Sequence, residues 1–291
     1  MSKVAIVTDS NAGISQEEGK ELGIYILPMP FLIDGVEYFE DINLTQEEFY
    51  EKLEADVDVS TSQPSAGSIL DLWDKIFNED GYDEIVFIPM SSGLSGACET
   101  AMMLAEEYDG RVQVVNNQRI SVTQRQSILD ALELVKRGMN ACEIKVFLED
   151  TKMDSSIFIM VDTLKYLKKG GRVTPAGAAL ATILGIKPVL QINGGKLDAY
   201  AKARSVKIAK RTMIEGIIND IKTRFPEDYE NNNFLLQVAY TYDKEAAEEF
   251  REEVKNMFPE IEPIVMNALS LSVSCHIGPG SLAVAYTRKV L

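Results

Sequence analysis

The sequence predicts a protein of the α/β class with two domains, a mostly parallel α/β sheet over residues 1–153 and an α+β domain with a largely antiparallel sheet over residues 154–291. In the first part, apolar strands alternate with amphipathic helices, which is typical of a parallel sheet covered on both faces. In the second part, hairpins pair the strands and helices back them. The length of 291 residues exceeds the usual size of one domain and fits this division.

The first domain is expected to open with a buried strand over 4–7 that ends in the polar residues 8–10. Ligands of open α/β sheets gather at such carboxyl ends of strands. The later elements follow from apolar periodicity and from turn and cap residues. In chain order they are a hairpin over 25–39 that turns at Asp34-Gly35, a helix opened by Thr45 with Glu48 in the capping-box position, a helix after Pro64 that runs to Phe77, strands over 85–90 and 112–115, and helices over 97–108 and 121–137.

The second domain is expected to mix hairpins with long helices, on the same signals. Its elements in chain order are a strand over 158–161, a short helix over 163–167, a turn over 169–172, an apolar helix over 176–184, a hairpin formed by 187–192 and 196–201, a helix over 206–224, a strand over 234–240, a helix over 244–257, and strands near 264–268 and 281–288. The helix over 176–184 is rich in small and branched residues, so it fits either the lining of a tunnel or tight helix-to-sheet packing.

The turn over 91–96, Ser-Ser-Gly-Leu-Ser-Gly, lies between a predicted strand and a predicted helix. The first N–H groups of a helix have no partner within it and lie at the positive end of its dipole, so such a turn suits an anion. Gly93 and Gly96 let the backbone approach a ligand, and the serine hydroxyls donate hydrogen bonds. A serine that only caps its own helix explains the pattern equally well, and the hydroxyls over 60–65 are open to the same two interpretations.

The formal charge of -16 would repel nucleic-acid phosphates and anionic lipids over most of the surface, so we expect no nucleic-acid partner and at most transient membrane contact. Cys98, Cys142 and Cys275 are odd in number and far apart, which favours a reducing, cytoplasmic location over a disulfide framework. No pair of these cysteines has metal-ligand spacing, and no metal is expected. The short apolar start before Asp9 does not suit a signal peptide, and no apolar window reaches the length of a membrane span.

His276 is the only histidine in the chain. A lone histidine most often lies on the surface or is satisfied within the core. Here Gly278-Pro279-Gly280 follows at once and predicts a tight turn, which would hold the imidazole at the edge of the last strands. The pattern therefore makes His276 a candidate site residue.

Taken together, these segments resemble the DegV family of fatty-acid-binding proteins. The resemblance runs the length of the chain and depends on several short motifs in a fixed order, each of them weak alone. They are Thr8-Asp9-Ser10, Thr61-Ser62-Gln63-Pro64-Ser65, Ser91-Ser92-Gly93-Leu94-Ser95-Gly96, Gly170-Gly171-Arg172, Lys187-Pro188-Val189-Leu190 and His276-Ile277-Gly278-Pro279-Gly280. Two positions depart from the family pattern at the rim of the site: Cys275 replaces a threonine, and Asn116-Asn117 replaces Asp-Ser.

The resemblance implies a DegV-like fold that holds one long-chain fatty acid between its domains and needs no other cofactor. The carboxylate would meet the hydroxyls of Thr61 and Ser95, with His276 close by, and the N–H groups at Ser95 and Gly96 would complete its donors. It also implies a carrier rather than an enzyme, because a separate fatty-acid kinase phosphorylates the held lipid for phospholipid synthesis. The further candidates for contacts with the head group or the partner are Ser62, Ser92, Arg172 and Arg204.

Two other functions stay open on the sequence. One is a serine hydrolase with Ser95 as nucleophile and His276 as base, although residues 92–96 lack the Gly-x-Ser-x-Gly spacing of a nucleophile elbow. The other is a binder of a different small anion that uses the same turns. A fatty-acid carrier differs from both because a buried tail supplies most of its affinity, at about 0.8 kcal/mol per CH₂.

Overall fold

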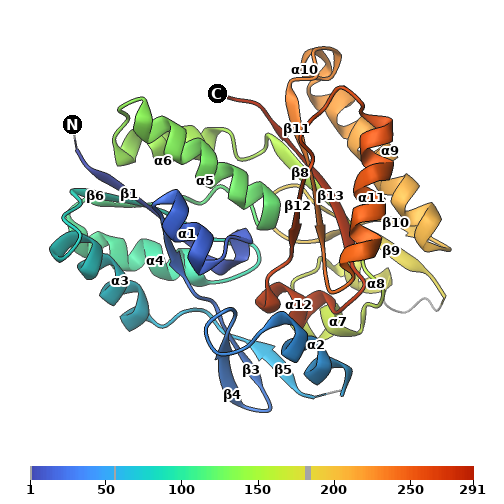
Figure 1. The fold of residues 1–291 in the computed structure, drawn as a ribbon, viewed down its shortest axis with the longest axis horizontal. Helices are drawn as coiled ribbons and strands as arrows, with labels where there is room; N and C mark the ends of the chain where they lie inside the picture. Colours follow the sequence, from blue (N-terminus) through green and yellow to red (C-terminus); the bar gives the residue numbers. More distant parts are fainter. Residues whose placement is uncertain (1, 56, 181–184) are drawn as a thin grey trace.

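The computed structural model describes residues 2–55, 57–180 and 185–291, and its first sheet is parallel throughout (Figure 1). The strands of this sheet, in the order β2-β1-β6-β7, are β1 (Val4–Asp9), β2 (Tyr25–Leu27), β6 (Glu84–Ile88) and β7 (Val112–Val114). Every residue of β1 is buried because helices cover both faces of the sheet. One face packs against α3 (Ala66–Asn78) and α4 (Ala97–Ala105), and the other against α1 (Gln16–Leu22), α5 (Ser121–Lys136) and α6 (Ala141–Asp150).

A small antiparallel sheet of order β4-β3-β5 comes next in the chain, formed by β3 (Pro30–Ile33), β4 (Val36–Phe39) and β5 (Val59–Thr61). The predicted turn at Asp34-Gly35 joins β3 to β4, with both turn residues at positive φ. The predicted hairpin over 25–39 is too long, because β2 instead extends the first sheet parallel to β1. The predicted capping box of Thr45 and Glu48 is confirmed, and it opens α2 (Gln46–Glu54), which packs on this sheet.

The third sheet is antiparallel except between its last two strands, and its order is β10-β9-β8-β13-β11-β12. Its strands are β8 (Ser155–Met160), β9 (Lys187–Ile192), β10 (Asp198–Ala203), β11 (Phe234–Tyr240), β12 (Val265–Ala268) and β13 (Leu282–Arg288). One face is covered by α9 (Val206–Arg224), with the short α10 (Pro226–Glu230) after it, and by α11 (Lys244–Met257). The opposite face turns toward α5, which packs against β8, β11 and β13.

Three short helices lie beside this inner face: α7 (Lys165–Gly170), α8 (Pro175–Leu180) and α12 (Leu271–Ile277). The described part of the predicted helix over 176–184 corresponds to α8, and residues 181–184 lie outside the described residues. Neither α12 nor α6 was expected from periodicity, yet cap residues open both: Ser270 accepts from the Val273 N–H, and Asn140 accepts from the Glu143 N–H.

The predicted fold class is confirmed, because a parallel sheet and a largely antiparallel sheet are both present and both are backed by helices. The division of the chain at residue 153 stays a prediction. Within the described ranges, no helix combines the length and the apolar character that crossing a membrane requires.

Candidate functional site

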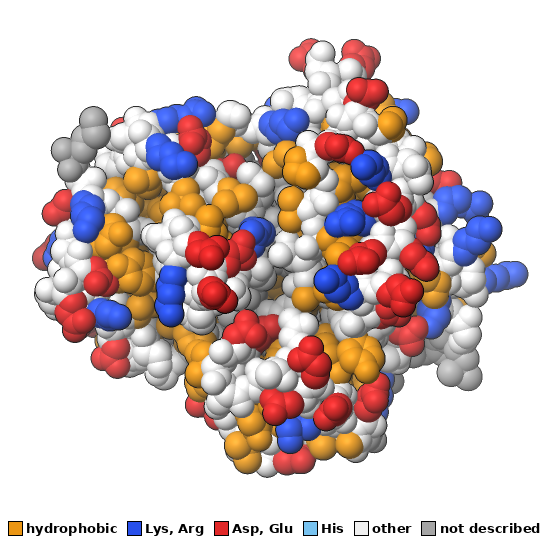
Figure 2. Space-filling model, in the orientation of Figure 1, with side chains coloured by type: hydrophobic (Ala, Val, Ile, Leu, Met, Phe, Trp, Pro, Cys, Tyr) orange, Lys and Arg blue, Asp and Glu red, His pale blue; other side chains and the backbone are white. Residues whose placement is uncertain are grey.

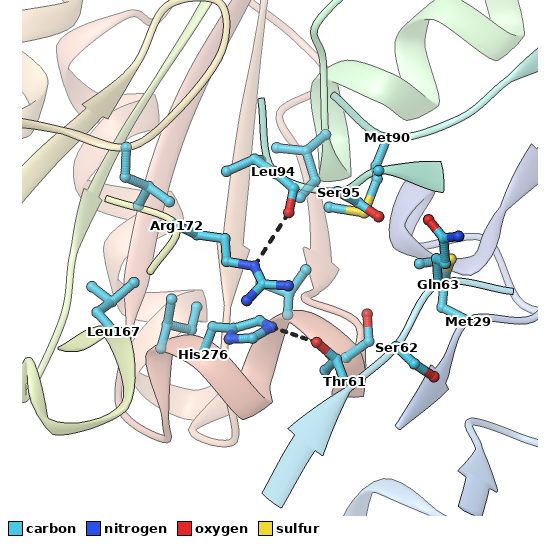
Figure 3. A pocket seen from close by; sticks show the side chains of 16 residues that line it. Met29, Thr61, Ser62, Gln63, Met90, Leu94, Ser95, Leu167, Arg172 and His276 are labelled. Atoms are coloured by element: carbon cyan, nitrogen blue, oxygen red, sulfur yellow. Dashed lines mark hydrogen bonds between the residues drawn. The ribbon is translucent and has the colours of Figure 1, made fainter. Parts of the chain in front are cut away.

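A cavity of about 210 Å³ lies where the first sheet, the small sheet and α12 meet (Figure 3). Its walls come from segments far apart in the chain, and they are formed by Met29, Thr61, Ser62, Gln63, Met90, Leu94, Ser95, Gly96, Ile120, Leu167, Arg172, Leu197, Ser272, Val273, His276 and Ile277. Six of the predicted site residues share this cavity: Thr61, Ser62, Ser95, Gly96, Arg172 and His276. The other two, Ser92 and Arg204, do not line it.

Thr61 and His276 meet directly across the cavity wall. The Thr61 Oγ1 lies 2.8 Å from the His276 Nε2, and a dashed line marks this contact in Figure 3. Thr61 is the last residue of β5, and His276 lies in the last turn of α12. The expectation that a turn at the edge of the last strands would hold the imidazole is therefore wrong, because the Gly278-Pro279-Gly280 turn begins only after the helix has placed it.

Arg172 brings a positive charge to the same cavity. Its Nε donates to the carbonyl oxygen of Leu94 at 3.3 Å, which orients the guanidinium beside the imidazole. Burial, and then the charge of Arg172, lower the pKa of His276 to about 4. The imidazole is thus neutral at neutral pH, and among the described residues that line the cavity it is Arg172 that carries a positive charge.

The turn over 91–96 combines the two roles that the sequence left open. The Ser95 Oγ accepts from the N–H of Ala97, the first residue of α4, at 3.2 Å, although the N-cap position itself is Gly96, and Ser95 also lines the cavity. The Ser95 N–H donates to the Ser91 carbonyl at 3.2 Å. The expectation that this N–H serves a ligand is therefore wrong, because the turn itself uses it. Over 60–65 the cap is Ser65, which accepts from the Ser68 N–H, and Thr61 is left to the cavity.

Gly93 permits close packing between two parts of the protein rather than the approach of a ligand. A Cβ at this position would lie 2.5 Å from the Cα of Gly195, in the turn between β9 and β10. The Ser91 Oγ donates to the Gly195 carbonyl at 3.1 Å beside this contact. The hairpin of the third sheet is thereby held against the turn that follows the first sheet.

A buried polar network at the end of β1 joins the walls of the cavity. The Asn11 Oδ1 accepts from the hydroxyls of Ser270 and Ser272, at 2.8 and 2.6 Å, which fixes the start of α12. The Asp9 carboxylate accepts from the Met90 N–H at 2.7 Å, which fixes the start of the turn over 91–96. The predicted polar strand end exists, but Asp9 is 1% exposed and is not part of the cavity lining.

Glu40 is a second support of α12 that sequence reasoning missed. Its Oε2 accepts from the Leu271 N–H at 2.8 Å, and its Oε1 accepts from the Gln46 Nε2 at 3.1 Å. Burial raises the pKa of Glu40 to about 7. No local pattern indicates this contact, because Glu40 follows β4 of the small sheet, whereas Leu271 begins α12, 231 positions later in the chain.

A second, apolar cavity of about 50 Å³ adjoins the first. The two have five apolar wall residues in common: Leu94, Ile120, Leu197, Val273 and Ile277. The residues that line only the inner cavity are Ser121, Val122, Ile157, Ile159, Ile192, Ala239, Leu269 and Ala283. In the described part of the helix predicted over 176–184, residues 176–179 line neither cavity.

Comparisons with known proteins show the family. The sequence matches the family described as "Uncharacterised protein, DegV family" over residues 3–289. The chain belongs to the DegV family. Among relatives, a DegV domain-containing protein of Streptococcus pneumoniae is 30% identical over 98% of both chains. One from Staphylococcus aureus is 29% identical over 99% of this chain and all of its own length.

Solved structures of DegV family proteins have the same fold. A fatty-acid-binding DegV family protein from Thermus thermophilus has a TM-score of 0.87 at 27% identity, covering 98% of this chain and 99% of its own. A stearic-acid-binding protein from Eubacterium ventriosum has a TM-score of 0.86 at 26% identity, covering 99% of each chain. The match to the family and these TM-scores confirm the expected family and fold, and both solved proteins are described as binding proteins and not as enzymes. In the ranges that the structure describes, no three His, Cys, Asp or Glu side chains gather as a metal site.

Asp9 is expected to make the protein less stable as the pH rises from about 4 to about 7. Burial raises its folded-state pKa from 3.8 to about 6, so between these values the folded protein binds more protons than the unfolded chain. The stabilisation present below pH 3.8 is lost as the pH rises through 6, an effect of up to about 3 kcal/mol. Urea unfolding at about pH 4 and about pH 7 measures the effect. Between these two values, the free energy of unfolding of the parent should fall by this amount relative to that of Asp9→Asn. Asp71→Asn, on the exposed face of α3, is the control, and a pH-independent difference for Asp9→Asn would contradict the assignment.

Proposed function

We propose that this protein holds one long-chain fatty acid in the two adjoining cavities and presents its carboxylate to a separate fatty-acid kinase. The observation that carries the proposal is a difference in polarity between the cavities: hydroxyls, an imidazole and a guanidinium lie among the apolar side chains of the outer one, and the inner one is lined by apolar side chains apart from Ser121. An amphiphile with an anionic head and an apolar tail matches this division. Relatives described as fatty-acid-binding and stearic-acid-binding support the same ligand class.

The head group is expected at Thr61, Ser95, Gly96 and Arg172. A carboxylate only accepts hydrogen bonds, so it needs the two hydroxyl protons and the guanidinium as donors. A neutral His276 can carry its proton on Nε2, and in that tautomer the Nε2–H donates to the Thr61 Oγ1, 2.8 Å away. That bond directs the hydroxyl proton of Thr61 toward the carboxylate. His276 is in this way a positioning residue for Thr61.

The tail supplies most of the affinity. Each buried CH₂ contributes about 0.8 kcal/mol, so a palmitoyl tail contributes on the order of 10 kcal/mol before ordering costs are subtracted. The inner cavity, at about 50 Å³, is smaller than such a tail, so the apolar side chains that line both cavities have to part for it. The polar head then remains in the outer cavity, beside the exposed Ser62, Gln63 and Gly96.

The contacts of Ser95 and His276 support a carrier over a hydrolase. The Ser95 Oγ accepts from the Ala97 N–H, and the described hydrogen bond of the His276 Nε2 goes to Thr61. A nucleophilic serine instead requires its base within hydrogen-bond reach, and the base requires an orienting partner. A binder of a small inorganic anion would have no use for the inner apolar cavity.

A basic segment is the proposed docking surface for the kinase. Residues 165–211 contain 11 Lys or Arg and one Asp or Glu, within a chain whose net charge is -16. In Figure 2, blue side chains crowd the right-hand edge of the molecule, where Figure 1 places β9, β10 and α9. Arg204 and Lys207 are exposed here, and Arg172 reaches the head-group cavity from the same segment. Such a surface attracts an acidic face of a partner and steers its approach.

We place the carrier in the cytoplasm, where the exposed Cys142 stays reduced.

Organic extraction of the protein purified from a bacterial host, followed by mass spectrometry, tests the ligand. About one long-chain fatty acid per chain is expected, because tight apolar burial retains the ligand through purification. Delipidated protein should take up palmitate again at the same ratio. A lipid-free extract combined with no uptake on titration would reject the function.

Removing a head-group donor should weaken binding. Thr61→Val and Ser95→Ala are each expected to lower the affinity for palmitate by roughly 5- to 100-fold, or about 1 to 3 kcal/mol, because the carboxylate loses one hydrogen bond in a buried site. Calorimetric titration of delipidated protein measures this. Ser92→Ala is the matched control, since Ser92 lies in the same turn as Ser95 but does not line the cavity. Parental affinity in both test variants would show that the head group lies elsewhere.

Reversing the charge of Arg204 should separate presentation from binding. Arg204→Glu is expected to lower the rate of acyl-phosphate formation by a fatty-acid kinase about tenfold at limiting carrier, because the attraction to the partner is weakened. Its affinity for palmitate should stay parental, since Arg204 does not line either cavity. Lys136→Glu, an equal charge change on α5, is the control. An equal loss in both variants, or none in Arg204→Glu, would contradict this docking surface.

A further inference from the structure

The inner face of the third sheet changes from large to small side chains along a single row. Strand pairing aligns Leu190 of β9, Ile159 of β8, Ala283 of β13 and Ala239 of β11 as successive neighbours across the sheet. Side chains that are aligned in this way point to the same face. The first two are branched, and the last two end at Cβ. From β8 to β13 the side chains of this row therefore become shorter by most of a side chain.

This descent coincides with the inner cavity. Ala239 and Ala283 are 1% and 2% exposed, and both line the inner cavity but not the outer one. Ile159, the larger neighbour of Ala283 on β8, lines the same cavity. Above the row lie Ser121 and Val122, from the first turn of α5. The hollow thus exists because β13 and β11 carry alanine where β8 and β9 carry branched residues.

We propose that the Ala239–Ala283 pair is the floor against which the end of the acyl tail rests, and that it sets the longest chain the protein accepts. The inference rests on the proposed function, since it concerns where the tail of a bound fatty acid stops. The head group is fixed at the far end by hydroxyls and a guanidinium, so a tail of given length reaches a given depth. Chains that exceed the space above the two alanines have to leave methylenes unburied or displace α5.

A purely structural reason for alanine here also exists, and one residue separates the two explanations. Small side chains let α5 approach β11 and β13 closely, whatever the ligand. Ala285 is in the next row of the same face on β13, is 1% exposed, and lines neither cavity. If close packing of α5 were the whole explanation, enlarging Ala285 and enlarging Ala283 would have the same consequences.

The test compares Ala283→Leu with Ala285→Leu, using octadecanoate and dodecanoate as probes with delipidated protein. Each methylene that loses its buried place lowers the affinity about fourfold. Ala283→Leu is therefore expected to lower the affinity for octadecanoate by at least about tenfold, while that for dodecanoate stays within about twofold of the parent. Ala285→Leu should leave the ratio of the two affinities parental, even if it lowers the melting temperature as much as Ala283→Leu does. Ala239→Val, which adds fewer atoms, should give a smaller change in the same direction as Ala283→Leu.

The outcomes also separate failure of this inference from failure of the proposed function. If the parent binds neither probe, the fatty-acid function itself is wrong. If the parent binds both and Ala283→Leu keeps the parental ratio, the floor lies elsewhere. An equal change of ratio in Ala283→Leu and Ala285→Leu would assign the alanines to the packing of α5 and overturn the inference. Should Ala283→Leu not fold, Ala239→Val provides the same comparison with Ala285→Leu.

Discussion

Two serine hydroxyls that donate to one buried amide oxygen hold the site together. Ser270 and Ser272 both donate to the Asn11 Oδ1, and two residues earlier Asp9 accepts from the Met90 N–H. A buried amide or carboxylate without partners is costly, so these bonds leave little freedom in how α12 and the turn over 91–96 sit on the end of β1. The position of His276 against Thr61, and that of Ser95 opposite them, follow from this arrangement.

Of the two basic side chains that meet in the site, Arg172 is charged and His276 is neutral. Burial, and then repulsion by the positive charge of Arg172, lower the pKa of His276, so the imidazole is neutral beside the guanidinium. A neutral imidazole can orient a hydroxyl, and a guanidinium can meet an anion. Farther in, no charge is needed, because the apolar wall between α5 and the third sheet suits a hydrocarbon tail.

Local signals predicted the elements that are stable for local reasons, and long-range contacts decided the others. The Asp34-Gly35 turn, the Thr45–Glu48 capping box and α9 could be predicted because turn residues, caps and a long apolar period lie within a few residues of one another. The seven-residue α12 could not, since a helix so short depends on the tertiary contacts around it. The predicted hairpin over 25–39 was too long because β2 pairs with β1 instead.

The sequence by itself determined the family, the fold class and the residue types of the site, because motifs, hydrophobic periodicity and donor side chains are properties of the chain. It could not determine which of them meet. Only the tertiary structure decided that Thr61, Ser95, Arg172 and His276 share one cavity while Ser92 and Arg204 lie outside it. The backbone of Ser95 is committed to its own turn, and the hollow over Ala239 and Ala283 exists only once strands far apart in the chain have paired. Such facts depend on register and on contacts across the fold, and neither is encoded in any local stretch of residues.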